Sequence, residues 1–179
     1  MRALRLLAGC VAAALASAAA AEPVVVQARF RADREALATL DRELWAPLTA
    51  AYAENRVDDY LAAFAPDAVI AGGDIPSLSP FPEWRRGMER RFLVRRSQVG
   101  RHRLDHRFTE RAVYRDWSSE RGVVAETDPD ETRYHEFHTF ARRLDGRWRI
   151  ATTYRKRLPR DAGEAAFAAA AAVGDHERF

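Results

Sequence analysis

The sequence predicts an α+β domain in which three N-terminal helices pack inside a curved antiparallel sheet. In the first half of the chain, apolar residues recur at the three- and four-residue steps of amphipathic helices. In the second half they alternate with polar residues, which is the period of strands. Helices that precede a run of strands are typical of α+β domains. A chain of 179 residues that is 47% hydrophobic can bury one core, so we expect one domain.

Residues 1–21 have the composition of a secretion signal. Arg2 and Arg5 provide a basic start, an apolar run follows, and small residues end the segment. We therefore expect removal of the signal and a periplasmic or secreted protein, with residues 22–31 as a linker to the domain. A lipid anchor at Cys10 is the alternative, but the apolar stretch ahead of this cysteine is short. Cys10 is the only cysteine, so loss of the signal would exclude disulfides.

The charge pattern does not indicate a polyanionic partner. The formal net charge is +3, and basic residues are interleaved with acidic ones. Nucleic-acid-binding proteins usually concentrate basic residues on one face or tract, so we expect no nucleic acid partner. Beyond the signal no apolar run is long enough to span a bilayer, and we expect no other membrane association.

Three helices are predicted, over residues 30–55, 59–64 and 83–96. Pro47 interrupts the first of them. Proline removes one backbone hydrogen bond and crowds the carbonyl four residues earlier, so we expect a kink just before it. Between the second and third helices we expect a short strand and then a surface loop over 72–82, because this segment is rich in glycine and proline.

The third helix has an apolar stripe, because Trp84, Met88 and Phe92 recur at four-residue steps. Packing against the sheet is the simplest role for this stripe. The same side chains would line any pocket between the helix and the sheet. We therefore name them as candidate substrate-binding residues, together with Phe140 and Trp148 of the last two strands.

The second half predicts four antiparallel strands, of which the last two form a hairpin over residues 133–157. A three-residue turn after Leu144 would pair Leu144 with Trp148 and His138 with Tyr154. The face that we expect to point inward is apolar, with polar side chains among the apolar ones: Tyr134, Glu136, His138, Phe140, Leu144, Trp148, Ile150, Thr152 and Tyr154.

Residues 159–179 form an alanine-rich tail. Its helix propensity is high, but it offers little large apolar surface for docking. We therefore expect a frayed or loosely packed helix.

Two segments carry a resemblance to a known family. Tyr-Leu-Ala-Ala-Phe-Ala-Pro-Asp-Ala-Val at 60–69 and Leu-Asp-Gly-Arg-Trp-Arg-Ile at 144–150 resemble the nuclear-transport-factor-2-like (NTF2-like) superfamily, and within it the SnoaL-like and DUF4440 group. The resemblance covers residues 32–158. It implies a cone of curved sheet and three helices that encloses a pocket, often in a homodimer paired through the sheet.

The resemblance specifies a fold more than a reaction, because the family hosts isomerases, dehydratases and members with no assigned chemistry. In ketosteroid isomerases of the family, the general-base aspartate would fall at the position that Gly72 occupies here. Asp74 is the nearest carboxylate, and as a turn residue it is a weak substitute.

His138 is the leading candidate for a catalytic residue. On an inward face it could carry a proton near neutral pH, with Glu136 orienting its ring. Tyr134 and Tyr154 could polarise a substrate oxygen through their hydroxyl groups. The alternative is structural, with a core histidine bonded to the backbone and tyrosines whose hydroxyl groups reach water.

Two functions remain open from the sequence. The first is general acid-base chemistry, of a lyase or isomerase kind, on a small apolar molecule in the pocket. The second is a non-catalytic module that binds a small ligand or dimerises. We expect no cofactor and no metal, because His102 and His106 are four residues apart on one strand, roughly 13 Å, too far for one zinc.

Overall fold

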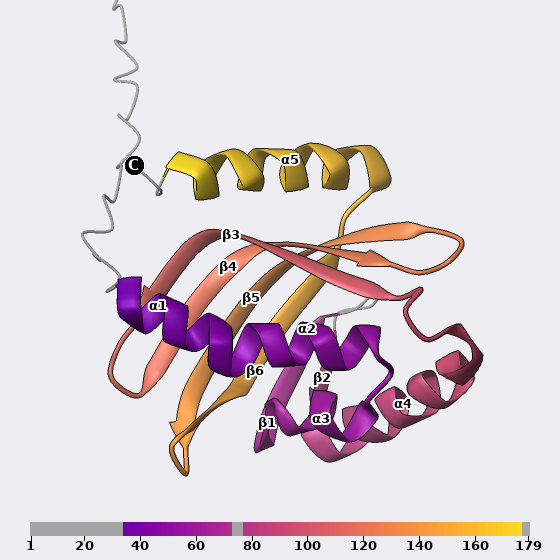
Figure 1. Cartoon of the computed structure of the whole chain (residues 1–179), viewed down its shortest axis with the longest axis horizontal. Helices are drawn as coiled ribbons and strands as arrows, with labels where there is room; N and C mark the ends of the chain where they lie inside the picture. The colour runs from indigo at the N-terminus through magenta and orange to yellow at the C-terminus, as the bar shows by residue number, and fades with distance from the viewer. Residues whose placement is uncertain (1–33, 73–76, 177–179) are drawn as a thin grey trace, which may run out of the picture.

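The computed structural model describes residues 34–72 and 77–176 (Figure 1). The predicted signal peptide, the linker and Cys10 lie outside the described residues, and so does Asp74. Side chains are described as far as residue 171.

The N-terminal helices form one bent rod followed by a short helix. The rod consists of α1 (Arg34–Leu40), the π-helical turn η1 (Asp41–Trp45) and α2 (Ala46–Ala53), and α3 (Val57–Ala62) follows. The π-helical turn ends two residues before Pro47, where the sequence predicts a kink. A proline supplies no N–H to the helix, and a wider turn before it relieves the contact with the earlier carbonyl.

Six strands form one curved sheet in the order β2-β1-β6-β5-β4-β3. The strands are β1 (Phe64–Gly72), β2 (Leu78–Pro80), β3 (Arg103–Val113), β4 (Trp117–Thr127), β5 (Thr132–Leu144) and β6 (Arg147–Arg157). All neighbours are antiparallel except β1 and β6, which run parallel, so the prediction of a purely antiparallel sheet is wrong at this one pair. The short edge strand β2 lies where the sequence predicts only a loop, and Pro80 is tolerated there because an edge strand leaves some N–H groups unpaired.

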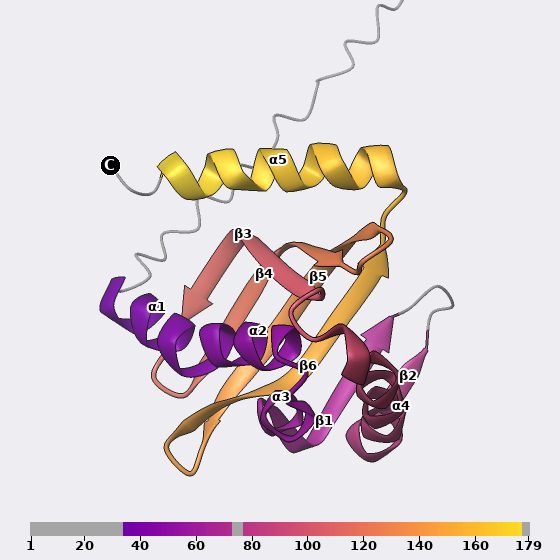
Figure 2. The ribbon, with the colours of Figure 1, turned by 45° about the vertical axis from the view of Figure 1, so that its right-hand side comes forward.

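The helices cover both faces of the sheet. The rod, α3 and α4 (Phe81–Val94) lie on the inner face, and α5 (Arg160–His176) lies across the outer face over β3, β4 and β5 (Figures 1 and 2). A single core fills the space between the inner face and the helices. Its largest fully buried side chains include Leu40, Leu44, Leu48, Tyr60, Phe92 and Phe137.

The β5–β6 hairpin departs from its predicted turn and then returns to the predicted register. The loop has two residues, Asp145 and Gly146, both with positive φ (51° and 76°), so Leu144 pairs with Arg147 rather than with Trp148. An irregularity then adds one residue to β6, because Ala141 pairs with Ile150 and Phe140 pairs with Thr152. Beyond this bulge His138 faces Tyr154, as the sequence predicts.

The predicted inward face of this hairpin is wrong on β5 and on the second half of β6. Phe137, Thr139 and Ala141 are the buried residues of β5, and on β6 they are Trp148 and Ile150 before the bulge and Thr153 after it. Successive side chains point to opposite faces, so an error of one position exchanges the two faces. The outer face therefore carries Tyr134, Glu136, His138, Phe140, Thr152 and Tyr154.

Helix α5 is docked, and the prediction of a loosely packed tail is wrong. The Phe167 ring contacts the Tyr134 ring with centroids 5.7 Å apart. The Arg107 guanidinium lies 3.8 Å from the centre of the Phe167 ring, and its Nη1 donates a hydrogen bond to the Phe167 carbonyl at 3.1 Å. Gly163 lies directly against Tyr134, which lets the helix approach the sheet closely. Among the described residues, no helix is both long and apolar enough to cross a membrane.

Candidate functional site

A cavity of about 280 Å³ lies between the inner face of the sheet and the helices α2 to α4. Its walls combine aromatic rings with a few polar groups. The aromatic residues are Trp45, Tyr52, Tyr60, Phe64, Trp84 and Phe137, and the charged or hydrogen-bonding residues are Ser77, Ser79, Arg91, His106, Glu126, His135, Thr139, Thr153 and Arg155. Mostly apolar walls with a few polar groups are typical of small-molecule sites.

The predicted substrate-binding residues are placed in three different environments. Trp84 and Met88 line the cavity. Phe92 and Trp148 are buried in the adjoining core. Phe140 lies on the outer face and is 41% exposed, so it has no access to the cavity.

The predicted catalytic residues gather on the outer face, away from the cavity. His138 Nε2 lies 3.0 Å from the Ser119 hydroxyl, and its ring contacts that of Phe140. Tyr134 packs against α5, while Tyr154 is partly exposed. The structure pairs His138 with Tyr154 across β5 and β6, but it places none of these residues in the pocket that the prediction assigned to them.

Trp45 is held in the cavity wall by a buried carboxylate. The π-helical turn ends at this residue, whose indole Nε1 donates a hydrogen bond to Glu120 Oε2 at 2.7 Å. Arg111 binds the other oxygen of Glu120 at 2.7 Å and also pairs with Asp41 in the same turn. Burial raises the pKa of Glu120, while Arg111 and Trp45 act in the opposite direction.

Two histidines of the cavity are held in the neutral form. Burial and the positive charge of Arg155 lower the pKa of His106 to about 3. Burial and several arginines, with Arg155 first among them, lower the pKa of His135 to about 4. In each ring Nε2 has no hydrogen-bond partner among the described residues, although His135 Nε2 lies 3.8 Å from Glu126 Oε2.

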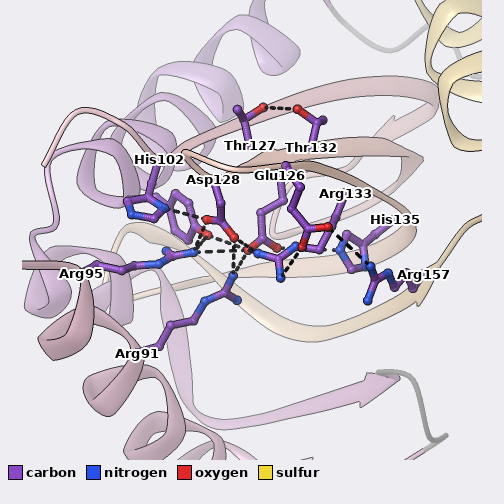
Figure 3. Close-up of polar contacts among 12 residues, drawn as sticks. Arg91, Arg95, His102, Glu126, Thr127, Asp128, Thr132, Arg133, His135 and Arg157 are labelled. Atoms are coloured by element: carbon purple, nitrogen blue, oxygen red, sulfur yellow. Dashed lines mark hydrogen bonds and ion pairs between the residues drawn. The ribbon is translucent and has the colours of Figure 1, made fainter. Parts of the chain in front are cut away.

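An ion-pair cluster borders the cavity, to which it contributes Arg91 and Glu126 (Figure 3). We call it the mouth cluster, and its members are Arg91, Arg95, His102, Glu126, Asp128 and Arg133. Glu126 accepts a hydrogen bond from the Tyr52 hydroxyl at 2.8 Å and pairs with Arg91. Arg95 Nη2 lies 2.8 Å from Asp128 Oδ1, and Arg133 pairs with the other oxygen of Asp128. His102 Nδ1 lies 2.6 Å from Asp128 Oδ1.

The mouth cluster also borders a second hollow of about 360 Å³, which His135 and Arg157 complete. Arg91, Glu126 and His135 line both the cavity and this hollow. The arginines outnumber the carboxylates in this region, so its local charge is positive although the whole chain is nearly balanced.

Arg155 differs from the arginines of the mouth cluster. It lies on β6 opposite Phe137 and lines the cavity. Within residues 34–72 and 77–176, no carboxylate lies within ion-pair distance of its guanidinium, whereas Arg91 and Arg95 each reach Glu126 and Asp128. Among the described residues, Arg155 is therefore the arginine of the cavity wall whose charge no carboxylate offsets.

Gly72 pairs with Arg155 at the end of β1. Its φ is +112°, and a Cβ there would lie 1.8 Å from the Arg155 carbonyl oxygen. A carboxylate side chain cannot occupy this backbone without displacing β6.

Sequence reasoning missed the cavity residues Trp45, His106, His135 and Arg155. His106 and Phe108 are two positions apart on β3 and therefore share one face of the strand. An apolar neighbour on the same face is a weak signal that His106 points inward. For His135 and Arg155 the only signal is strand parity, which the two-residue turn changes on β5 and the bulge changes on β6.

The comparisons with known proteins concern the fold. No protein-family model and no curated protein matches the chain. An NTF2-like protein of unknown function from Shewanella oneidensis MR-1 is 11% identical over 69% of this chain and 98% of its own, with a TM-score of 0.55. An NTF2-like protein of unknown function from Pseudomonas putida KT2440 is 12% identical over 68% of this chain and 87% of its own, with a TM-score of 0.53.

A protein of unknown function with a cystatin-like fold from Nostoc punctiforme PCC 73102 is 16% identical over 71% of this chain and 92% of its own, with a TM-score of 0.52. At these sequence identities the likeness concerns only the arrangement of helices and strands. Membership of the SnoaL-like and DUF4440 group stays a prediction. The chain has the NTF2-like fold, an open cone of curved sheet around its helices.

Proposed function

We propose that the cavity binds a small molecule with an apolar body and an anionic group such as a carboxylate. The observation that carries the proposal is the position of Arg155, which lines an aromatic cavity without a carboxylate partner among the described residues. A charge held in such surroundings is costly unless it is paired. A ligand carboxylate would supply the partner, and guanidinium groups bind carboxylates in a two-pronged geometry.

The remaining walls fit the other end of such a ligand. Trp45, Phe64 and Trp84 offer flat apolar surfaces to its body. His106 and His135 are neutral, so each can donate or accept a hydrogen bond without adding charge. Small-molecule pockets usually measure about 300–1,000 Å³, so a cavity of about 280 Å³ calls for a compact ligand.

The second candidate is proton transfer of a lyase or isomerase kind, which the approach of His135 to Glu126 at 3.8 Å favours. With a pKa of about 4, His135 is a weak base. A ligand carboxylate beside Arg155 would offset the positive charge that lowers this pKa. Binding would thus prepare His135 to accept a proton, in the role that the sequence assigned to His138.

Thermal unfolding with a panel of compact aromatic and branched aliphatic carboxylates tests the binding proposal. Each acid is paired with the amide of the same skeleton, which keeps the shape and removes the charge. We expect some acids to raise the unfolding midpoint of the wild type, their amides to have little effect, and Arg155→Gln to abolish the response.

Arg121→Gln is the matched control, because Arg121 is an exposed arginine of the neighbouring outer face. It should respond to the acids as the wild type does. A response that is equal for acids and amides, or that survives in Arg155→Gln, would refute the proposal that an anionic group of the ligand binds Arg155. Turnover of a bound acid that is lost in His135→Gln and kept in His138→Gln would establish the second candidate.

We also propose export and homodimerisation, on the grounds given by the sequence. The basic and apolar segments of residues 1–21 support export, and detection of a shortened chain outside the cytoplasm would test it. For the dimer, α5 leaves Phe140 and Tyr154 uncovered on the outer face, each 41% exposed. Loss of dimers from Phe140→Arg in analytical ultracentrifugation would support pairing through this part of the sheet.

A further inference from the structure

Helix α4 has a second face that points away from the cavity. Trp84, Met88 and Phe92 are turned inward, while Arg86, Arg90 and Val94 follow one another at four-residue steps on the outside. The helix lies at the periphery of the fold, at the end remote from α5 (Figures 1 and 2). The 3-10 turn η2 (Arg95–Gln98) and the link to β3 continue this outer surface.

This surface is strongly basic. From Glu83 to Arg103 the chain has eight arginines and two carboxylates. Arg85 pairs with Glu89, and two further arginines belong to the mouth cluster. The other five have no ion-pair partner in the part of the chain that the structure describes: Arg86, Arg90, Arg96, Arg101 and Arg103.

Aliphatic side chains protrude among these arginines. Leu93 is 56% exposed, Val94 is 81% exposed and Val99 is 56% exposed. Single exposed apolar residues are ordinary, but here three lie within seven positions of a segment that also carries five arginines without an ion-pair partner among the described residues. We call this the α4 surface.

We propose that the α4 surface docks on an anionic lipid bilayer. Cationic groups are attracted to a negatively charged leaflet, and aliphatic side chains gain free energy by entering the boundary between headgroups and acyl chains. Arginine can lay its apolar stem along this boundary while its guanidinium binds a headgroup phosphate. Docking of this kind requires no membrane-spanning helix.

Other occupants fit the α4 surface less well. A second copy would bring two arginine-rich surfaces together, and like charges in contact are unfavourable. A nucleic acid would engage the arginines through its phosphates but would leave Leu93, Val94 and Val99 in water. A bilayer uses both the charge and the apolar side chains.

Co-sedimentation with lipid vesicles tests the proposal. We expect the protein that begins at Glu22 to bind vesicles in which about a third of the phosphatidylcholine is replaced by phosphatidylglycerol, and not to bind pure phosphatidylcholine. Each of Arg86→Gln and Arg90→Gln should weaken binding about fivefold. Leu93→Ser with Val94→Ser should also weaken it, while circular dichroism verifies that all variants fold.

The control is Arg115→Gln with Arg147→Gln, because both arginines are exposed, one in the β3–β4 turn and the other at the start of β6. Equal binding to neutral vesicles, or an equal loss in the control, would overturn the proposal. If the variant Leu93→Ser with Val94→Ser bound anionic vesicles as strongly as the wild type, the binding would depend on charge alone. That result would favour a soluble polyanion as the partner of the α4 surface and would also overturn the proposal. Arg155→Gln should bind vesicles normally, which separates this result from the ligand proposal.

Discussion

Trp45 donates a hydrogen bond from its indole Nε1 to Oε2 of Glu120, which lies 75 positions later in the chain, at 2.7 Å. Glu120 is 0% exposed, and its other oxygen is bound by Arg111. This contact joins the N-terminal rod to the middle of the sheet through a buried charge. It also sets the orientation of one aromatic wall of the cavity.

Glu120→Ala should lower the free energy of unfolding by about 3–5 kcal/mol, because it leaves Arg111 and the Trp45 indole without their partner. Glu120→Gln keeps the shape and one acceptor, so its loss should be smaller. Urea unfolding followed by tryptophan fluorescence measures both. Glu136→Ala on the outer face is the control, with an expected change of less than about 0.5 kcal/mol. Equal effects at Glu120 and Glu136 would contradict the structural role of the buried carboxylate.

The stability of the fold should decrease in mild acid because of His106 and His135. Both have an ordinary pKa near 6.5 in the unfolded chain, whereas the folded protein keeps them neutral down to about pH 3 and about pH 4. Below pH 6.5 the unfolded state therefore binds more protons, and the free energy of unfolding falls as the pH drops, by up to about 1.4 kcal/mol per pH unit for each histidine.

His106→Phe isolates one of these two contributions. Phenylalanine suits the surroundings of Trp45, Phe108 and Phe137 and does not titrate. Urea unfolding at pH 7.5, 6 and 5 should show a shallower pH dependence for this variant than for the wild type. His138→Gln, on the outer face, should leave most of the dependence intact. If the free energy of unfolding of His106→Phe changed with pH as steeply as that of the wild type, His106 would have to be protonated in the folded state.

Arg155→Gln should raise the pKa of His135, since it removes a positive charge that lowers this pKa. Arg121→Gln should instead raise the pKa of His138, whose lowered value has burial and Arg121 as its causes. Titration of the imidazole C–H resonances by NMR distinguishes the two histidines. If Arg155→Gln changed the pKa of His138 and not that of His135, the assignment of Arg155 to the cavity would be refuted.

Gly163→Ala should detach α5 from the outer face. A Cβ at this position would lie 2.4 Å from Tyr134 Cβ, so the helix or the strand must shift. Hydrogen exchange of the α5 amides should become faster, while the amides of β5 and β6 keep their protection. Gly87→Ala in α4 is the matched control, because nothing lies within 4 Å of its added Cβ. It should stabilise the protein by about 0.5–1 kcal/mol through helix propensity alone.

The fold class could be predicted because its signals are local. The stripe of Trp84, Met88 and Phe92 requires only helical spacing, and Asp145 with Gly146 marks a hairpin wherever strands flank it. The docking of α5 could not be predicted in the same way. Its contact depends on the absence of a side chain at Gly163 and on Arg107, which comes from a distant strand.

The residues that face the candidate site depend on two details of the β5–β6 hairpin, its two-residue turn and the residue inserted in β6. Ala151 carries none of the glycine or turn chemistry that usually marks a bulge, so the alternating pattern was extended through it unchanged. The two-residue turn directs His135 rather than His138 inward on β5, and the residue inserted at Ala151 directs Arg155 rather than Tyr154 inward on β6. The net charge of the whole chain likewise gives no sign of a basic region. The fold concentrates arginines on one side of α4 and at the mouth cluster.

The parallel pairing of β1 with β6 has a consequence for how the protein acquires its shape. Phe64 aligns with Ile150 and Ala71 with Tyr154. A strand from the first half of the chain therefore cannot pair in this way until the last strand has been synthesised. Contacts between such remote segments slow folding, typically into the millisecond-to-second range. The cavity wall depends on this late-synthesised strand, because a chain that ends before Arg147 would lack the lining residues Ile150, Thr153 and Arg155.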